Sequence, residues 1–263
     1  MSVLEAVILG IIQGFSEFLP ISSSGHLVLF QKLFGITESS MAFDILLHVA
    51  TLIPVIIVYR DIISGLIKKP FQKLTYLLVA GTIPAVIVAL IGGGFIDSLF
   101  QTGGSLAIGF IITGFLLMAT DNIKGGYKKQ EGITYVDAIL VGCIQAVATV
   151  PAISRSGSTI FGSVTRKLDR ATAAKFSFLL SIPAIAGATV LELKKFIAGG
   201  ETFAIDMLPM VFGFISAMLS GYLAINFMLK LIMDAKLKYF AYYVWLIALF
   251  IIIGQSPVPT FLK

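Results

Sequence analysis

Polar side chains that can handle phosphate are concentrated in one short part of an apolar segment near the N-terminus. They are Glu17, Ser22, Ser23, Ser24, Gly25 and His26. A carboxylate can hold a divalent cation together with substrate phosphate oxygens, so Glu17 is a candidate metal ligand. The serine hydroxyls and the amide of Gly25 can donate hydrogen bonds to phosphate. The imidazole of His26 suits a general acid, a general base or a phosphoryl acceptor.

A second polar segment supplies the positive charge that such a site needs. Its candidate phosphate-binding residues are Ser154, Arg155, Ser156, Gly157 and Thr159. A guanidinium can grip phosphate through two parallel N–H bonds, and neighbouring hydroxyls can donate to the same group. An ion pair between Arg155 and a carboxylate such as Glu17 is an alternative role. The two roles are compatible, because a bare buried arginine would be costly when no phosphate is bound.

The two polar segments are copies of one pattern. Residues 10–25 read GIIQGFSEFLPISSSG, and residues 142–157 read GCIQAVATVPAISRSG. At a constant offset of 132, two glycines, a glutamine and two serines coincide. Each copy interrupts a short apolar run with proline, serine and glycine. Interrupted segments at corresponding positions of two halves indicate a binding site within a membrane.

The composition is that of an integral membrane protein. Hydrophobic residues make up 57% of the chain and charged residues 13%, against about 45–50% and about 25% in soluble domains. Six stretches are long and apolar enough to cross a bilayer, at 41–60, 73–95, 104–121, 171–193, 207–230 and 238–255. We expect a single membrane domain over 1–263, with repeat halves of about 1–131 and 132–263.

Two further apolar regions, 2–34 and 134–167, are too interrupted to cross the membrane. Each predicts a re-entrant helix-loop-helix hairpin that enters and leaves by the same face. With one hairpin and three spans in each half, the second half is inserted upside down. The expected fold is therefore all-α, with six transmembrane helices, two opposed re-entrant hairpins and an inverted-topology repeat.

The basic residues indicate the orientation of this arrangement. Thirteen lysines and arginines fall on one predicted face, whereas the other has only Lys32, Lys194, Lys195 and Lys263. By the positive-inside rule the basic loops are cytoplasmic, and both termini are extracytoplasmic in the plasma membrane. We attribute the net charge of +5 to the basic cytoplasmic loops, and we expect no nucleic-acid partner.

Several polar residues allow more than one interpretation. Ionisable groups at membrane depth are costly, which favours functional roles for Glu17 and His26. Ser22 and Ser24 fit helix capping as well as phosphate binding. Asp44 and His48 share a helix face and suit either a supporting or metal-binding role or a polar packing pair. The aromatic residues Tyr242, Tyr243 and Trp245 are candidate interfacial anchors.

Together the segments 13–26 and 151–159 resemble the two signatures of the undecaprenyl-pyrophosphate phosphatases of the bacitracin-resistance type. The resemblance extends over the whole chain in length, span pattern and repeat. It implies a membrane enzyme that hydrolyses undecaprenyl (polyprenyl) diphosphate to the monophosphate and phosphate, with Mg²⁺ or Ca²⁺, and so recycles the lipid carrier of cell-wall synthesis. By motif position it implies active-site roles for Glu17, Ser23 and His26, and phosphate binding by Arg155.

The chain departs from the family pattern at two positions. Well-known members carry a second glutamate where this chain has Gln13, and a glycine where it has Ala152. The attacking group is left open between Ser23, His26 and a water molecule activated by His26. A transporter that flips a polyprenyl phosphate through the same buried site is the alternative function. The oligomeric state is not fixed by the sequence, and a homodimer is compatible with it.

Overall fold

The computed structural model describes residues 1–36, 41–198, 206–234 and 236–254, and every regular element in these ranges is helical. The elements of the first half are α1 (Val3–Phe18), α2 (Ser23–Leu33), α3 (Met41–Val58), α4 (Arg60–Lys68), α5 (Lys73–Thr102) and α6 (Leu106–Asn122). Those of the second half are η1 (Gln130–Gly132), α7 (Tyr135–Val147), α8 (Arg155–Thr165), α9 (Arg170–Ala198), α10 (Met207–Met233) and α11 (Lys238–Gly254).

The helix boundaries repeat with the offset seen in the sequence. The pairs of helices α1 and α7, α2 and α8, and α6 and α11 each begin 132 residues apart. The halves differ after α3, where the chain breaks at Tyr59 and forms the short helix α4. The corresponding helix α9 continues without a break to Ala198. The internal duplication is therefore present in the structure, with one local asymmetry.

Both predicted hairpins form as a helix, a turn and a second helix. Each begins with a capping box, made by Ser2 with Glu5 in α1 and by Thr134 with Asp137 in α7. Helix α1 ends at Phe18, shortly before Pro20, and α7 ends at Val147, in a turn that contains Pro151; neither proline can continue a helix. These local signals explain why the hairpin boundaries match those expected from the sequence.

The two halves are interlocked, because each hairpin packs on a helix of the other half. Helix α1 lies along α10 and α7 lies along α5. A Cβ added at Gly10 would overlap the carbonyl oxygen of Gly213, and one at Gly142 would overlap that of Gly81. These glycines occupy matching positions in the two copies. Glycine therefore allows the same close backbone approach at both crossings.

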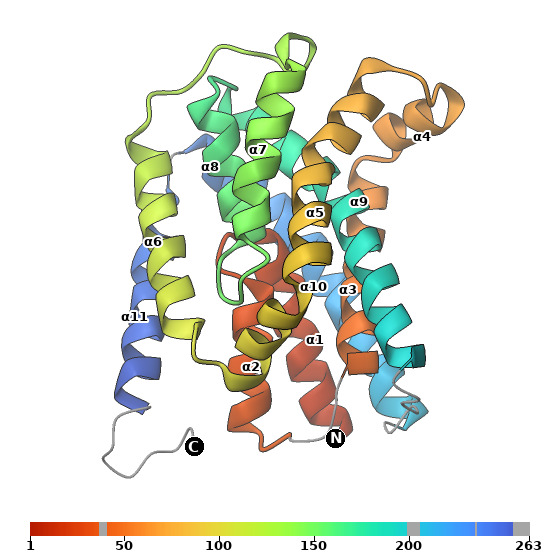
Figure 1. Ribbon diagram of the computed structural model, residues 1–263, viewed down its shortest axis with the longest axis vertical. Coiled ribbons are helices and arrows are strands. Elements are labelled where there is room, and N and C mark those ends of the chain that lie inside the picture. Colours follow the sequence, from red (N-terminus) through yellow and green to blue (C-terminus); the bar gives the residue numbers. More distant parts are fainter. Residues whose placement is uncertain (37–40, 199–205, 235, 255–263) are drawn as a thin grey trace.

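The hairpins enter the bundle from opposite ends. In Figure 1, α1 and α2 occupy the lower part, α7 and α8 the upper part, and their turns meet near mid-height. At the junction, a Cβ on Gly25 would lie 2.8 Å from the Cα of Ala152. The hydroxyl of Ser156 also donates to the carbonyl of Leu19 at 3.3 Å. The turns are thus in direct contact.

Four of the described helices, α3, α5, α9 and α10, have the length and hydropathy of membrane spans. Two further apolar helices, α6 and α11, are 17 residues long. The six predicted spans fall on these helices with different ends: α5, α9 and α10 extend beyond the predicted spans, and the predicted span 41–60 runs past the end of α3 at Val58 and the break at Tyr59. Residue 255, the predicted end of the last span, and the basic residue Lys263 lie outside the described residues. The chain is a multi-pass, all-helical membrane protein.

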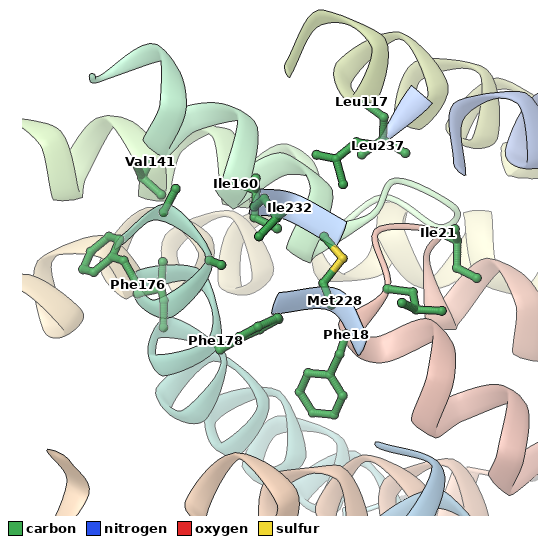
Figure 2. Close-up of a cluster of buried hydrophobic side chains, with 14 of the residues drawn as sticks. Phe18, Ile21, Leu117, Val141, Ile160, Phe176, Phe178, Met228, Ile232 and Leu237 are labelled. Carbon is green, nitrogen blue, oxygen red and sulfur yellow. The ribbon is translucent and has the colours of Figure 1, made fainter. Parts of the chain in front are cut away.

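Buried apolar side chains from both halves form the core around the hairpin turns. Phe18 of α1 meets Phe178 of α9 edge to face, with ring centroids 5.8 Å apart. Figure 2 shows these two rings close to Met228 of α10 in the centre of the cluster. Because Phe18 directly follows Glu17, this packing fixes the end of α1 that carries the carboxylate.

Candidate active site

Glu17 is the centre of the polar contacts where the two hairpins meet. It lies in the last turn of α1, and its side chain is 6% exposed. One carboxylate oxygen, Oε1, accepts a hydrogen bond from Arg155 Nη2 at 2.9 Å. The other, Oε2, accepts bonds from the Ser23 hydroxyl at 2.6 Å and from Gln13 Nε2 at 3.1 Å. Three donors thus compensate the burial of one charge.

Ser23 reaches Glu17 because of the turn that precedes it. It is the first residue of α2, and Ser22 before it has φ 71° and ψ 103°, a conformation uncommon for any residue other than glycine. The Ser22 hydroxyl accepts a bond from the Gly25 amide at 3.4 Å and lies 3.3 Å from the Ser24 hydroxyl. Ser22 therefore caps α2, while Ser23 is directed at the carboxylate.

Arg155 comes from the matching position of the second hairpin, as the first residue of α8. Its side chain is 16% exposed. Nη2 bonds Glu17, and Nη1 donates to the carbonyl of Ser177 in α9 at 3.3 Å. A guanidinium carries five N–H donors, so these two contacts leave capacity for a phosphate group. The predicted ion pair between Arg155 and Glu17 is present.

The remaining candidates of the second segment are held in a framework of backbone and hydroxyl contacts. Ser154 caps α8 by accepting from the Gly157 amide at 3.1 Å, and lies 3.3 Å from the Ser156 hydroxyl. This repeats the arrangement of Ser22, Gly25 and Ser24. Thr159 bonds the Ser177 hydroxyl at 2.6 Å. In this arrangement the matched serines stabilise the starts of α2 and α8.

His26 is directed away from the carboxylate. Its side chain is buried, with Nδ1 2.7 Å from the Ser22 carbonyl and Nε2 2.9 Å from the Tyr243 hydroxyl of α11. The ring stacks on that of Tyr243 and meets Phe110 edge to face. The structure thus brings together Glu17, Ser23 and Arg155, whereas the ring of His26 lies between the Ser22 carbonyl and Tyr243 of α11.

Three contributors to the site are not evident from motif spacing alone. Gln13 lies one helical turn before Glu17, so the spacing of four residues indicates their contact only once α1 is known to be a helix. Ser177 and Tyr243 come from α9 and α11, far along the chain. No local signal in the sequence identifies these two.

Asp44 and His48 of α3 lie at the edge of this region. Asp44 Oδ1 accepts a bond from Gln31 at 2.8 Å, and His48 Nδ1 lies 2.7 Å from the Asp44 carbonyl. His48 is also within electrostatic range of Glu17 and of Glu192 in α9. The predicted pair is therefore linked through the backbone, and His48 adds to the electrostatic environment of Glu17.

The polar groups around Glu17 fit a divalent cation in part. Gln13 is fully buried, and its Oε1 has no hydrogen-bond partner. This carbonyl oxygen, the Glu17 carboxylate and the Ser23 hydroxyl are the oxygen ligands that Mg²⁺ and Ca²⁺ accept. Among the described residues, no group of three or more His, Cys, Asp and Glu side chains is arranged as a metal site. Substrate oxygens would therefore have to complete the coordination.

Comparison with known proteins identifies the family. The model of the family described as bacitracin resistance protein BacA matches residues 6–250, which include both hairpin turns and all of the described helices except the start of α1 and the end of α11. The chain belongs to this family. The match covers every residue of the Glu17, Ser23 and Arg155 cluster.

Named relatives of the family match over nearly their full length. A protein of Carboxydothermus hydrogenoformans named undecaprenyl-diphosphatase is 50% identical over 257 residues, covering 97% of this chain and 98% of the relative. Undecaprenyl-diphosphatase 4 of Bacillus thuringiensis is 47% identical over 255 residues, with the same coverage. An undecaprenyl-diphosphatase of Methanobrevibacter smithii is 37% identical over 278 residues, again covering 97% and 98%.

Proposed function

We propose that this chain hydrolyses undecaprenyl diphosphate to undecaprenyl monophosphate and inorganic phosphate, and so recycles the lipid carrier for cell-wall polymer synthesis. The family and the names of its relatives support this activity. The observation that carries it at the site is the contact of Glu17 with both Ser23 and Arg155. A hydroxyl that can attack phosphorus, a carboxylate that can act as a base and a guanidinium that can bind phosphate are therefore together in one buried cluster.

We also propose that α1–α2 and α7–α8 are re-entrant hairpins and that six helices span the plasma membrane. The opposed entry of the hairpins and the apolar character of α6 and α11 support this. Helix α1 begins and α11 ends at one end of the bundle, while basic segments 60–73, 124–129 and 166–170 lie at the other (Figure 1). By the positive-inside rule, the latter end is cytoplasmic and the termini are extracytoplasmic.

The first step of the proposed reaction transfers the terminal phosphoryl group. Arg155 holds its oxygens and stabilises the charge that develops on them. Ser23 Oγ forms a bond to the terminal phosphorus while the bond from phosphorus to the bridging oxygen breaks. Undecaprenyl monophosphate leaves with that electron pair. Glu17, which already accepts the Ser23 hydrogen bond, takes the serine proton.

Water completes the reaction in a second step. It attacks the phosphoserine phosphorus while the bond from phosphorus to Ser23 Oγ breaks. Glu17 returns the proton that it holds to Ser23 Oγ, and inorganic phosphate leaves with both protons of the water molecule. The short bond from Ser23 to Glu17 is the reason for choosing Ser23 over His26, whose two ring nitrogens are both engaged. The buried position of the cluster strengthens its electrostatic interactions.

A divalent cation is proposed as the cofactor. Glu17, the carbonyl oxygen of Gln13 and the Ser23 hydroxyl would hold it, together with phosphate oxygens of the substrate. When bound, Mg²⁺ or Ca²⁺ neutralises phosphate charge and orients the diphosphate. The glutamine supplies a neutral oxygen where well-known members of the resembled family have a carboxylate, so we expect weaker cation binding here than at a two-carboxylate site. The homodimer remains a prediction.

Phosphate release by the purified protein tests the activity. We expect wild-type protein in detergent to release phosphate from undecaprenyl diphosphate and a chelator to stop it. Glu17→Gln should abolish release, whereas Glu5→Gln, a change at a half-buried residue in the first turn of the same helix, should not. Translocation of the lipid by a wild-type protein that releases no phosphate would contradict the enzyme and favour the transporter.

A further inference from the structure

The ring of His26 is held by groups from two helices distant in sequence. It is 2% exposed. The ring plane of Tyr243 in α11 lies 7° from that of His26, with centroids 5.6 Å apart. The ring of Phe110 in α6 meets it at 84° and 5.1 Å. His26 is therefore fixed in position and in orientation.

The hydrogen bonds of His26 define its tautomer. A backbone carbonyl can only accept a hydrogen bond, so the 2.7 Å contact with the Ser22 oxygen requires a proton on Nδ1. In the neutral ring Nε2 then carries a lone pair. The Tyr243 hydroxyl, at 2.9 Å, donates to it. The Ser22 carbonyl thus fixes the tautomer, and the Tyr243 hydroxyl satisfies the remaining ring nitrogen and holds the ring in place.

The Ser22 carbonyl belongs to the turn that orients Ser23. Ser22 has a positive φ of 71°, a conformation that persists only where surrounding contacts hold it. The next residue, Ser23, places its hydroxyl 2.6 Å from Glu17. The Nδ1–H of His26 is a contact that holds Ser22 in this conformation. A chain of two hydrogen bonds therefore connects Tyr243 to the residue that precedes Ser23.

The second hairpin shows the same principle with different residues. Its turn contains Ala152 at φ 66°, and Thr113 of α6 donates to the Ala152 carbonyl and accepts from the Ser154 amide, both at 2.9 Å. Helices α6 and α11 occupy matching positions in the repeat. Each turn is thus held by the last helix of the other half. This correspondence favours a structural function for the Tyr243 contact over a chance encounter.

We propose that Tyr243 is a positioning residue for the phosphatase reaction: through His26 it holds the Ser22 turn and keeps Ser23 directed at Glu17. This role rests on the proposed function. Tyr243 is 39% exposed on the outside of the bundle, so its ring faces lipid while its hydroxyl points inward. In that setting no water replaces a lost hydroxyl. Phenylalanine at this position would keep the ring contact with His26 but lose the hydrogen bond to its Nε2.

The test compares Tyr243→Phe with Tyr242→Phe. Tyr242 is a neighbouring exposed tyrosine whose ring meets Trp245 edge to face, whereas Tyr243 stacks on His26. We expect Tyr243→Phe to lower kcat about tenfold with KM changed less than about twofold, because binding by Arg155 is kept. Tyr242→Phe should change neither constant. Wild-type kcat in Tyr243→Phe, or an equal loss in Tyr242→Phe, would overturn the proposal.

Nitrogen NMR detects the hydrogen bond between Tyr243 and His26 independently of enzyme activity. The chain has two histidines, so labelling with nitrogen-15 histidine gives two pairs of ring-nitrogen signals, and a His48→Gln variant assigns them. Near pH 8, above the ordinary pKa of histidine, we expect His26 to carry its proton on Nδ1. Tyr243→Phe should shift its Nε2 signal, and Tyr242→Phe should not.

The two measurements separate the two proposals. A His26 that carries its proton on Nε2 in the wild-type protein overturns the positioning role, even if Tyr243→Phe does not fold. A wild-type protein that shows the expected tautomer but releases no phosphate overturns the proposed function, and with it any role of Tyr243 in that reaction.

Discussion

The two hairpins share their backbone and differ in their chemistry. Both have a capping box at the start, a serine cap on the second helix and a glycine crossing with the opposite half. The first presents Glu17 and Ser23 at the junction, and the second presents Arg155. Gene duplication thus accounts for the framework, whereas divergence at a few positions supplies complementary groups. Neither hairpin alone contains the complete cluster.

Removing the group that only the second hairpin contributes should break this complementarity most strongly. Arg155→Ala should lower kcat/KM by about 10³-fold or more, since both phosphate binding and the charge pair with Glu17 are lost. Arg155→Lys should lose less, because it keeps the charge and loses the planar fork. Phosphate release measures both. An Arg155→Ala protein with wild-type activity would contradict the division of roles.

The matched glutamines provide a second comparison. Gln13 donates to Glu17 at 3.1 Å, whereas Gln145 donates to the backbone of Gly81 at 3.3 Å. Gln13→Ala should lower kcat/KM by about 10–100-fold because the carboxylate loses a neighbour and a candidate cation ligand. Gln145→Ala should leave kcat/KM within about twofold, at a cost of about 1 kcal/mol in unfolding free energy. Equal losses of activity would show that the copies are not functionally distinct.

The matched glycines should respond alike, because they serve the shared framework. Gly10→Ala and Gly142→Ala each place a methyl group against a facing carbonyl oxygen. Each should lower the unfolding free energy by about 2 kcal/mol. Thermal unfolding in detergent measures this, with Gly93→Ala as a control, since a Cβ there meets no atom within 4 Å. A large loss in one copy and none in the other would break the symmetry of the two crossings.

The matched acidic caps should show the smallest contrast. Burial raises the pKa of the Asp137 carboxyl, but hydrogen bonds from Lys128, Thr134 and Arg166 outweigh it and lower the pKa to about 2 from 3.8. The stabilisation is therefore complete above about pH 4 and is lost as the pH falls toward 2. Asp137→Asn should remove this stabilisation and lower the free energy of unfolding by about 1.5 kcal/mol. The melting temperature of the variant should then decline less steeply between about pH 4 and pH 2 than that of the wild type.

The corresponding glutamate of the first hairpin is the control for that measurement. Glu5 caps α1 through Ser2 and makes no ion pair among the described residues. Hydrogen bonds from Ser2 lower the pKa of Glu5, but no salt bridge from a described residue adds to them, so Glu5→Gln should change the acid-dependent part of the melting curve less than Asp137→Asn does. A decline as steep in Asp137→Asn as in the wild type would show that the salt bridges of Asp137 do not stabilise the second hairpin.

The repeat made much of this architecture predictable. Proline, serine and glycine mark the turns, so the helix pairs and the convergence of Glu17 with Arg155 follow from the aligned copies. The packing of each hairpin on a helix of the other half could not be predicted in this way, because it depends on tertiary contacts such as those of Gly10. The same holds for Tyr243, which reads as an interfacial anchor until its contact with His26, 217 residues away, is seen.

The most direct test of the account is the site of a trapped phosphoryl group. Wild-type protein is mixed with undecaprenyl diphosphate labelled in the terminal phosphate and quenched within one turnover, one sample in acid to preserve phosphoserine and one in alkali to preserve phosphohistidine. We predict label on Ser23 and none on Ser154 or Ser156 of the second hairpin. Turnover with no label on Ser23, or with label on His26 or on a serine of the second hairpin, would contradict the account.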